Sequence, residues 1–229
     1  LHNGISYVTV GDFGSIMTSG NGAEFAAEIV PDGATNTTLL GLAGDTNLLV
    51  TVGDSGVILY STNSLAELVT TNGSVVATNL VSELGFAWQS ADSPTAETLQ
   101  AVTLFNGEFY VGGNNGYVAK SVDGRNWSGI TPFTAKTLTG MASSAGGQAK
   151  IVAVGDDGAA YVSSDGAVFT AAAIAATSDW LYRVRHLNGN FVIVGQNGVI
   201  ITSADDGQTW AARNSGSTAW INDVIHVGD

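Results

Sequence analysis

Short hydrophobic runs alternate with glycine-rich polar turns along this chain, and one arrangement of them recurs five times. Each copy has an apolar run, then Gly, a polar residue, any residue and Gly, and then a second apolar run that ends in Ser. β-Branched and aromatic residues dominate the runs, and Asp or Asn beside Gly favours tight turns, so each copy predicts a β-hairpin. The copies span residues 7–19, 49–61, 109–121, 151–163 and 191–203.

Further short strands are expected on both sides of each hairpin. A second turn follows each final Ser and leads to an apolar residue, and another apolar run precedes each hairpin, at 39–43, 99–103, 138–142, 181–185 and 221–225. About four strands per ~40 residues is the spacing of a propeller blade. The pattern therefore predicts an all-β, five-bladed β-propeller of four-stranded antiparallel blades, formed by one domain over 1–229. The longest interval between copies places an insertion within 69–97.

Neither end of the chain holds a complete blade. The sequence begins just before the second strand of a blade, and it stops just after the inner strand expected at 221–225. We expect the C-terminal strand to pair into the N-terminal blade and close the ring, because closure removes two exposed sheet edges.

The turn after the last hairpin carries a resemblance to known repeats. The segment SADDGQTW (203–210) fits the Asp-box pattern, and 181–210 is similar to units of bacterial repeat proteins. The chain resembles Asp-box (BNR-like) bacterial repeat β-propellers, and it is similar to sialidase-type and photosystem stability-factor-like propellers. The resemblance implies a propeller in which the Asp box is a structural turn. It indicates little about function, because one fold hosts many functions.

Charge and composition exclude several classes of function. The net charge is −13 with only seven basic residues, which argues against nucleic acid as a partner. There is no cysteine, and no apolar run approaches the ~20 residues of a membrane-spanning helix. Low charge, abundant small polar residues and no cysteine together suggest an exported bacterial protein. We expect a monomeric domain without a cofactor or membrane insertion.

Several motifs with catalytic or metal-binding associations are better explained as turns. Gly53-Asp54-Ser55-Gly56 imitates a protease nucleophile motif, but the other repeats hold unrelated residues in the place of Ser55. Each aspartate-bearing turn supplies one or two carboxylates, whereas calcium needs about six oxygen ligands. These aspartates are Asp123, Asp165, Asp205 and Asp206. We therefore expect no metal site and no catalytic residue there, and we interpret the three histidines as turn residues.

An enzyme remains an alternative. Paired carboxylates could serve glycoside hydrolysis or a lyase reaction. The candidate acids are Asp92, Glu97, Glu108 and Asp223. The arginine triad of sialidases cannot be assembled from the four arginines available, Arg125, Arg183, Arg185 and Arg213.

The repeats differ most where the chain enters each inner strand. Two neighbouring repeats carry a Trp and a charged residue there, namely Trp180 with Arg183 and Trp220 with Asp223, whereas the others carry Thr and a small residue. Inner strands line the channel of a propeller, so these side chains are expected at its channel face. They form either an aromatic ligand platform or ordinary inter-blade packing with an Arg183–Asp223 ion pair. Trp88, in the predicted insertion, could overhang the same face.

These observations favour a non-enzymatic module that binds a glycan or a protein on the channel face. A glycoside hydrolase or lyase, and a purely structural repeat domain, are the alternatives.

Overall fold

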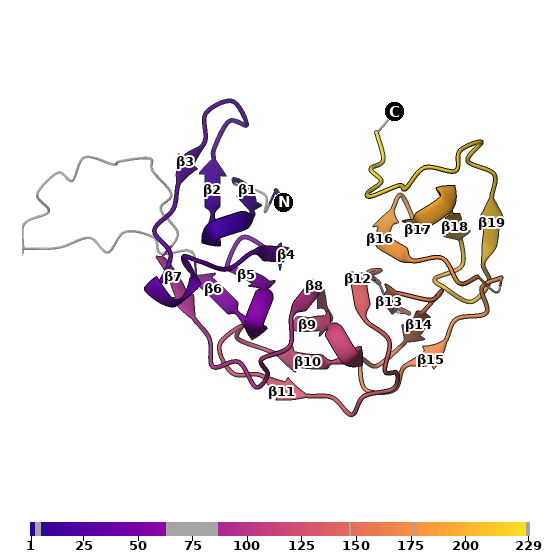
Figure 1. Ribbon diagram of the computed structural model, residues 1–229, viewed down its shortest axis with the longest axis horizontal. Coiled ribbons are helices and arrows are strands. Elements are labelled where there is room, and N and C mark those ends of the chain that lie inside the picture. Colours follow the sequence, from indigo (N-terminus) through magenta and orange to yellow (C-terminus); the bar gives the residue numbers. More distant parts are fainter. Residues whose placement is uncertain (3–5, 63–86, 147, 176, 228–229) are drawn as a thin grey trace, which may run out of the picture.

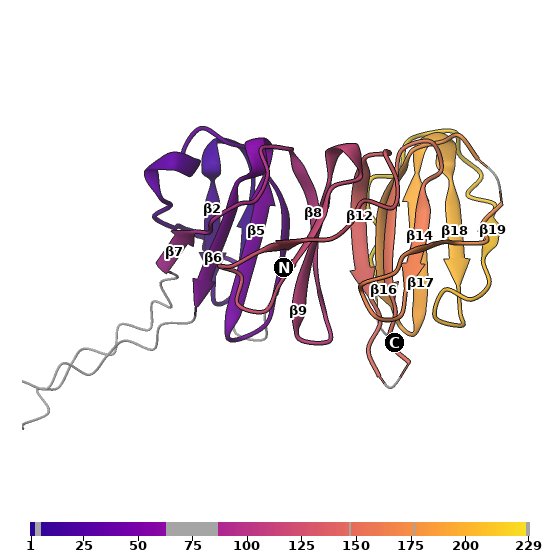
Figure 2. The same cartoon turned by 90° about the horizontal axis from the view of Figure 1, so that it is seen from below.

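The protein is built from five antiparallel sheets that lie side by side in an arc, as the computed structural model shows (Figure 1). The structure describes residues 1–2, 6–62, 87–146, 148–175 and 177–227. Four sheets have four strands and the first has three, which confirms the predicted all-β fold with five blades. The strands of all blades stand upright beside one another when the arc is viewed from its side (Figure 2). Most of the predicted insertion lies outside the described residues.

Each blade is a meander whose strands follow one another from the inside of the arc to the outside. Blade 1 contains β1 (Tyr7–Val10), β2 (Ile16–Ser19) and β3 (Ala26–Ala27). Blade 2 contains β4 (Leu39–Gly44), β5 (Leu48–Gly53), β6 (Ile58–Thr62) and β7 (Ala87–Ser90). Blade 3 contains β8 (Leu99–Phe105), β9 (Glu108–Gly113), β10 (Val118–Ser121) and β11 (Ser128–Gly129). Blade 4 contains β12 (Leu138–Ser143), β13 (Ile151–Gly155), β14 (Ala160–Ser163) and β15 (Thr170–Ala171). Blade 5 contains β16 (Leu181–Leu187), β17 (Asn190–Gly195), β18 (Ile200–Ser203) and β19 (Ala211–Arg213).

The recurrent Gly-x-x-Gly turn joins the second and third strands of a blade, and in blades 1, 2, 3 and 5 it is a short 3₁₀ turn. In blade 2 this turn is η3 (Asp54–Gly56), where Ser55 and Gly56 both have positive φ, at 56° and 72°. The first glycine, Gly53, is extended instead, and a Cβ there would lie 2.0 Å from the carbonyl oxygen of Thr38. Of the two glycines, the second provides the left-handed conformation. The first glycine instead allows the segment at Thr38 to approach closely.

The turns that resemble Asp boxes are closed by their own side chains. Asp205 accepts hydrogen bonds from Ser203 Oγ at 2.8 Å and from the backbone N–H of Thr209 at 2.9 Å. The hydroxyl of Ser203 also accepts a bond from the N–H of Gly207 at 2.8 Å. Asp123 and Asp165 form the same kind of turn. Their carboxylates are occupied by turn amides, as the sequence predicted.

The hydrophobic core is divided into layers, one between each pair of consecutive blades. Val52 of blade 2, for example, packs in one cluster with Leu99 and Phe109 of blade 3. Equivalent clusters join blades 1 and 2, blades 3 and 4, and blades 4 and 5. Among the described residues, no such cluster joins blade 5 to blade 1. The alternation of apolar residues in the repeats is thus used to stack blades, as in a propeller.

The predicted closure of the ring is not found among the described residues. Leu1 exchanges two backbone hydrogen bonds with Val8, at 2.8 and 3.0 Å, so the start of the chain itself pairs with β1. Residues 221–225, expected to be the closing strand, are assigned to no strand. They stay beside blade 5, where the N–H of Ile221 donates to the carbonyl of Gly195 at 3.0 Å. The termini accordingly lie on opposite sides of an opening in the arc (Figure 1).

In the described part of the chain, no helix has the length and hydropathy needed to cross a membrane.

Candidate functional site

A β-bulge near the start of each inner strand prepares the candidate site. In blades 2 to 5 the pairing register between the first and second strands shifts by one residue. Bulges of this kind re-aim a side chain. The residues at the shift are Leu40, Gln100, Thr139 and Tyr182. All four line the same cavity, so the repeated bulge turns one residue from each blade toward a common space.

This cavity has a volume of about 310 Å³. Its other walls come from two more recurring positions of the blades. Thr137 and Trp180 stand directly before the inner strands of blades 4 and 5. Asn114 and Asp156 belong to the turns that follow the second strands of blades 3 and 4. Arg183 of β16 completes the lining. We call this space the inner-strand pocket. Its size is at the lower end of the range for small-molecule and peptide side-chain sites.

Two charged side chains of the inner-strand pocket each have one buried polar atom without a hydrogen-bond partner among the described residues. These atoms are Nε of Arg183 and Oδ1 of Asp156. The ion pairs within the described part of the chain do not include either residue. Burial lowers the pKa of Arg183 from its ordinary value, and the neighbouring positive charge of Arg185 adds to this effect. A buried polar atom without a partner is costly, so a ligand that supplies one would be stabilised here.

The other polar side chains of the pocket already have partners. Thr139 Oγ1 donates to the carbonyl oxygen of Leu181 at 2.6 Å, which links blade 4 to blade 5. The Gln100 amide donates to Asn114 Oδ1 at 3.3 Å. The hydrogen-bonding capacity left for a ligand is therefore concentrated on the Arg183 and Asp156 side.

Three aromatic rings gather next to Arg183. The ring centroid of Trp220 lies 6.2 Å from that of Trp180 and 6.1 Å from that of Tyr182, with the rings tilted or edge to face. Trp180 and Trp220 are 44% and 50% exposed, which is unusual for such large apolar side chains. We call these residues the aromatic cluster. Its rings face solvent at the edge of the inner-strand pocket instead of being packed between blades.

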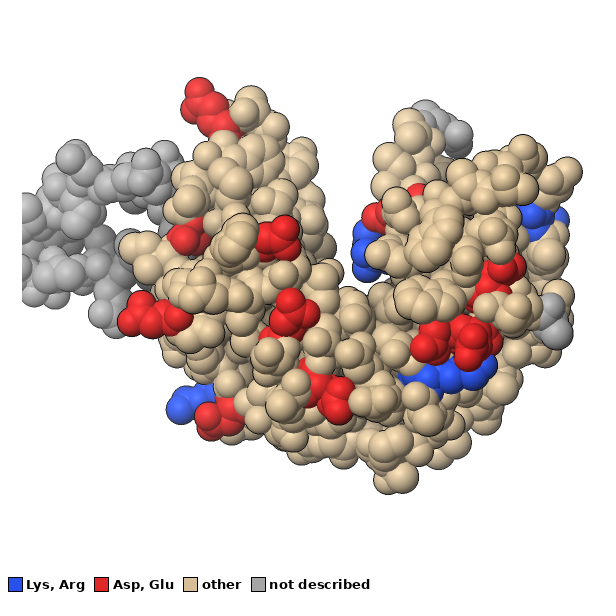
Figure 3. All heavy atoms as spheres, viewed as in Figure 1, with Lys and Arg blue, Asp and Glu red and all other residues tan. Residues whose placement is uncertain are grey.

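Asp223 pairs with Arg185, and not with Arg183 as one interpretation of the sequence held. Arg185 donates two hydrogen bonds to its carboxylate, at 2.9 and 2.7 Å. Partial burial is the largest single effect and opposes the charged form of Asp223. The hydrogen bonds from Arg185 and the N–H of Val224, together with the positive charges of Arg185 and Arg183, hold the pKa of this carboxyl below its usual range. Asp223 thus forms its ion pair with Arg185 and acts on Arg183 only through its charge, so Arg183 has no ion-pair partner among the described residues. In the space-filling view, acidic side chains are spread over the blades, while a basic group borders the opening beside β16 (Figure 3).

Trp88 does not belong to this site. It lies in β7, the outermost strand of blade 2, and is only 6% exposed within the core layer between blades 1 and 2. The four remaining candidates, Trp180, Arg183, Trp220 and Asp223, do come together at blade 5.

Two of the carboxylates proposed for hydrolysis, Glu108 and Asp223, are not arranged as a pair. Glu108 begins β9, at the opposite end of that strand from η4 (Asn114–Gly116), and forms an ion pair with Lys120 at 3.0 Å. Asp223 lies two blades away with its own basic partner, Arg185. Within the described residues, no group of three or more His, Asp or Glu side chains could hold a metal ion. His2 and His186 instead contact the rings of Tyr7 and Phe191.

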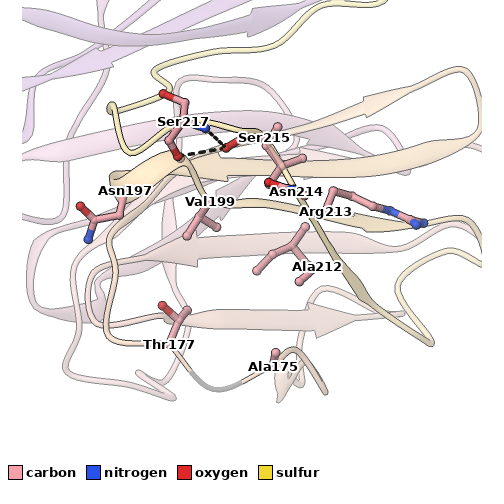
Figure 4. Close-up of a pocket in the computed structure, with 12 residues that line it drawn as sticks. Ala175, Thr177, Asn197, Val199, Ala212, Arg213, Asn214, Ser215 and Ser217 are labelled. Carbon is pink, nitrogen blue, oxygen red and sulfur yellow. Dashed lines mark hydrogen bonds between the residues drawn. The ribbon is translucent and has the colours of Figure 1, made fainter.

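A second cavity, of about 360 Å³, lies at the outer side of blade 5 (Figure 4). Its polar groups largely satisfy one another: Ser215 and Ser217 are joined by two hydrogen bonds of 3.2 Å, and Asn197 donates to Asp179 at 2.7 Å. The Arg213 side chain extends away from the other labelled residues and donates to Thr202 at 2.8 Å. This cavity offers a ligand fewer unsatisfied groups than the inner-strand pocket.

Sequence reasoning missed the four bulge residues and Asp156. Each bulge residue lies between the two positions at which the repeats differed, two residues after the Trp or Thr and one before the charged or small residue. A comparison of that intermediate position would have revealed Tyr182 as an aromatic departure from Leu40, Gln100 and Thr139. Asp156 had no such signal, because every other repeat also has a polar residue there.

Comparison with known proteins supports the fold. The family model "DUF6242 beta propeller domain" matches residues 68–179, which is just under half of the chain. No protein of curated function matches the sequence. The solved structures it resembles include "YCF48 bound to D1 peptide", with a TM-score of 0.61 at 16% identity over 92% of this chain and 63% of that one.

Two other solved structures are also similar to the chain. "Crystal structure of RRP9 WD40 repeats" has a TM-score of 0.67 at 11% identity, covering 97% of this chain and 66% of that one. "Structure of U3-55K" has a TM-score of 0.66 at 10% identity, covering 97% and 67%. The chain thus spans about two thirds of the length of the solved structures it matches. At these identities the likeness concerns the fold alone.

Proposed function

We propose that this β-propeller is a non-enzymatic interaction module that binds a segment of a partner protein at the aromatic cluster and the adjoining inner-strand pocket. The observation that carries the proposal is the half-exposed aromatic cluster beside a pocket with two unsatisfied charged groups. Aromatic residues and arginine are enriched among the residues that dominate binding energy at protein interfaces. The structurally similar YCF48 is described as bound to a peptide, which agrees with this use of the fold.

A glycan is the second candidate ligand, because exposed aromatic rings beside hydrogen-bonding groups also suit a sugar. The pocket supports a peptide better, since its unsatisfied groups carry full charges. Export from a bacterial cell and a monomeric state stay predictions from the sequence. The separation of Glu108 from Asp223 does not favour a hydrolase that would use these two carboxylates as a pair.

The proposal is tested by selecting binders from a random peptide display library and from a glycan array, and by measuring them against a double variant, Trp180→Ala/Trp220→Ala. Both side chains are about half exposed, so their removal should leave the fold intact. A pair of interface aromatic residues is worth about 2 kcal/mol or more, so affinity should fall about 30-fold or more.

Phe13→Ala is the matched control. Phe13 is 80% exposed in η1 (Asp12–Gly14) of blade 1, outside the aromatic cluster, and its removal should leave affinity unchanged. Peptides that bind wild type and the double variant equally would show that the site is wrong. If the screens yield glycans and no peptides, the ligand of this site is a sugar and the proposed protein partner is wrong.

A further inference from the structure

We infer that the ligand of the inner-strand pocket carries a carboxylate, which pairs with Arg183, and next to it a hydrogen-bond donor, which bonds to Asp156. This inference rests on the proposed function and specifies the chemistry of its ligand. Peptides offer this combination at two places, at a C-terminal residue and at an acidic side chain next to a backbone N–H.

The unsatisfied groups define the two polar ends of the ligand. Arg183 Nε is a buried donor and Asp156 Oδ1 is a buried acceptor, and both residues line the same pocket without forming an ion pair. A ligand acceptor at the guanidinium of Arg183 and a ligand donor at the carboxylate of Asp156 would compensate these two side chains. The guanidinium geometry suits a carboxylate, with two parallel N–H···O bonds, better than it suits a single carbonyl oxygen.

The surrounding charges favour an anion at Arg183 specifically. Arg185, two residues along β16, already has a compensating partner in Asp223, with which it shares two hydrogen bonds. Arg183 has no such partner, although it is desolvated enough for its pKa to be lowered. A bound carboxylate would supply the missing negative charge in partly buried surroundings, where charge-assisted bonds are strongest.

The departure of Arg183 from the repeat supports a role outside packing. Its position holds Gly41, Ala101 and Gly140 in blades 2 to 4. A Cβ on Gly41 would meet the backbone N of Val102 at 3.1 Å, and a Cβ on Gly140 would meet that of Val184 at 3.1 Å, so neighbouring inner strands require a small residue there. Blade 5 holds the largest side chain of this series at that position, and Arg183 lines the pocket.

The aromatic cluster indicates which chemical group the ligand has next to its carboxylate. Trp180 and Tyr182 line the pocket together with Arg183, and Trp220 contacts both rings. An apolar or aromatic group attached close to the carboxylate would stack on these rings while the carboxylate reaches Arg183.

Matched probes test the chemistry directly. N-acetyl-phenylalanine has a carboxylate, an adjacent N–H and an aromatic ring, and N-acetyl-phenylalaninamide differs only in lacking the negative charge. Binding is followed by NMR at the arginine Nε–H groups, because the chain has only four arginines and the Arg183→Lys variant identifies the signal of Arg183. We expect a saturable shift of the Arg183 signal with the acid, and binding of the amide at least about tenfold weaker.

Further probes test the contact with Asp156 separately from that with Arg183, and distinguish a C-terminal carboxylate from a side-chain carboxylate. 3-Phenylpropionate lacks the N–H, so it should bind more weakly than N-acetyl-phenylalanine to wild type but with equal affinity after Asp156→Ala. The amidated dipeptide N-acetyl-Phe-Asp-amide carries its only carboxylate on a side chain, and its affinity relative to N-acetyl-phenylalanine tells which source the site prefers. Arg213→Gln, at the outer cavity, is the matched control and should change nothing.

The possible failures are distinguishable. Equal binding of acid and amide, with loss of both in Trp180→Ala/Trp220→Ala, would overturn the carboxylate inference and leave the proposed function intact. Absence of a saturable shift at Arg183 with every acid would overturn the inference as well. Equal binding of all probes to wild type and to the tryptophan double variant would refute the proposed function itself.

Discussion

The first glycine of the Gly-x-x-Gly turn allows a test of whether the ring is open, because this glycine is crowded by an inner strand in blade 2 and has free space beside it in blade 1. In blade 2, a Cβ on Gly53 would lie 2.0 Å from the carbonyl oxygen of Thr38 and 3.0 Å from Cα of Leu39. In blade 1, Gly11 occupies the same position of the repeat, and nothing lies within 4 Å of a Cβ placed there. Both glycines are extended, with φ of −168° and −173°, so alanine brings no backbone strain at either position.

The two substitutions should therefore differ by several kcal/mol. In Gly53→Ala the segment at Thr38 must move by an ångström or more, at an overpacking cost of about 1–3 kcal/mol. The hydrogen bond from the N–H of Asp54 to the Thr38 carbonyl, 3.0 Å long, would be lost or stretched, which adds about 1 kcal/mol. We expect Gly53→Ala to lower the free energy of unfolding by about 2–4 kcal/mol. Gly11→Ala should leave it unchanged or raise it by up to about 1 kcal/mol, because alanine restricts the unfolded chain.

Urea denaturation followed by tryptophan fluorescence and circular dichroism measures both variants on one scale. A loss in Gly11→Ala as large as that in Gly53→Ala would mean that a strand lies against Gly11, as in a closed ring. A neutral Gly53→Ala would refute the close approach in blade 2.

Two further predictions concern the turns. Ser203→Ala removes the buried hydroxyl that bonds to Asp205 and to the N–H of Gly207, so the free energy of unfolding in urea denaturation should fall by about 1–2 kcal/mol. Ser61→Ala is the control and should cost almost nothing, because the buried hydroxyl of Ser61 has no partner among the described residues. Equal losses in the two variants would contradict the role of the Asp205 turn. Hydrogen bonds to Asp205, from the side chain and then the backbone of Thr209 and from Ser203, lower the pKa of its carboxyl to about 2. Because the folded pKa lies below the unfolded value of about 3.9, the stabilisation is complete above pH ~4 and is lost as the pH falls toward 2. The stability difference between wild type and Asp205→Asn should accordingly shrink over that interval, and a difference that is independent of pH would refute the assignment.

The sequence predicted the repeated architecture well because the five copies of the repeat can be compared position by position. Asp54, Asp123 and Ser55 could be recognised as turn residues by comparing five copies, and the structure places all three in turns. The inner strands at 39–43, 99–103, 138–142 and 181–185 were likewise found where apolar residues recur. Local patterns of this kind determine strands and hairpins directly.

Features that depend on the curvature of the whole arc could not be predicted in this way. The pattern at 221–225 is that of an inner strand, yet whether it meets β1 is decided by how far each core layer rotates one blade against the next. Arg183 and Arg185 stand two residues apart in β16 and share a face of the strand, so the sequence could not tell which of them pairs with Asp223. Trp88 could not be assigned either, since a lone tryptophan near an insertion has no repeated counterpart to show whether it is buried.

The layered core has a consequence for how stability is distributed along the chain. Blades 2, 3 and 4 each share an apolar layer with two neighbours, whereas blades 1 and 5 each share one. An arrangement of this kind behaves as a one-dimensional array, in which each unit is held by its own folding energy and by nearest-neighbour terms. Fraying should start at the two ends and advance blade by blade, with the middle blade the last to open. The aromatic cluster and Arg183 lie on a terminal unit, so a ligand bound between blades 4 and 5 would stabilise one of the two ends at which fraying starts.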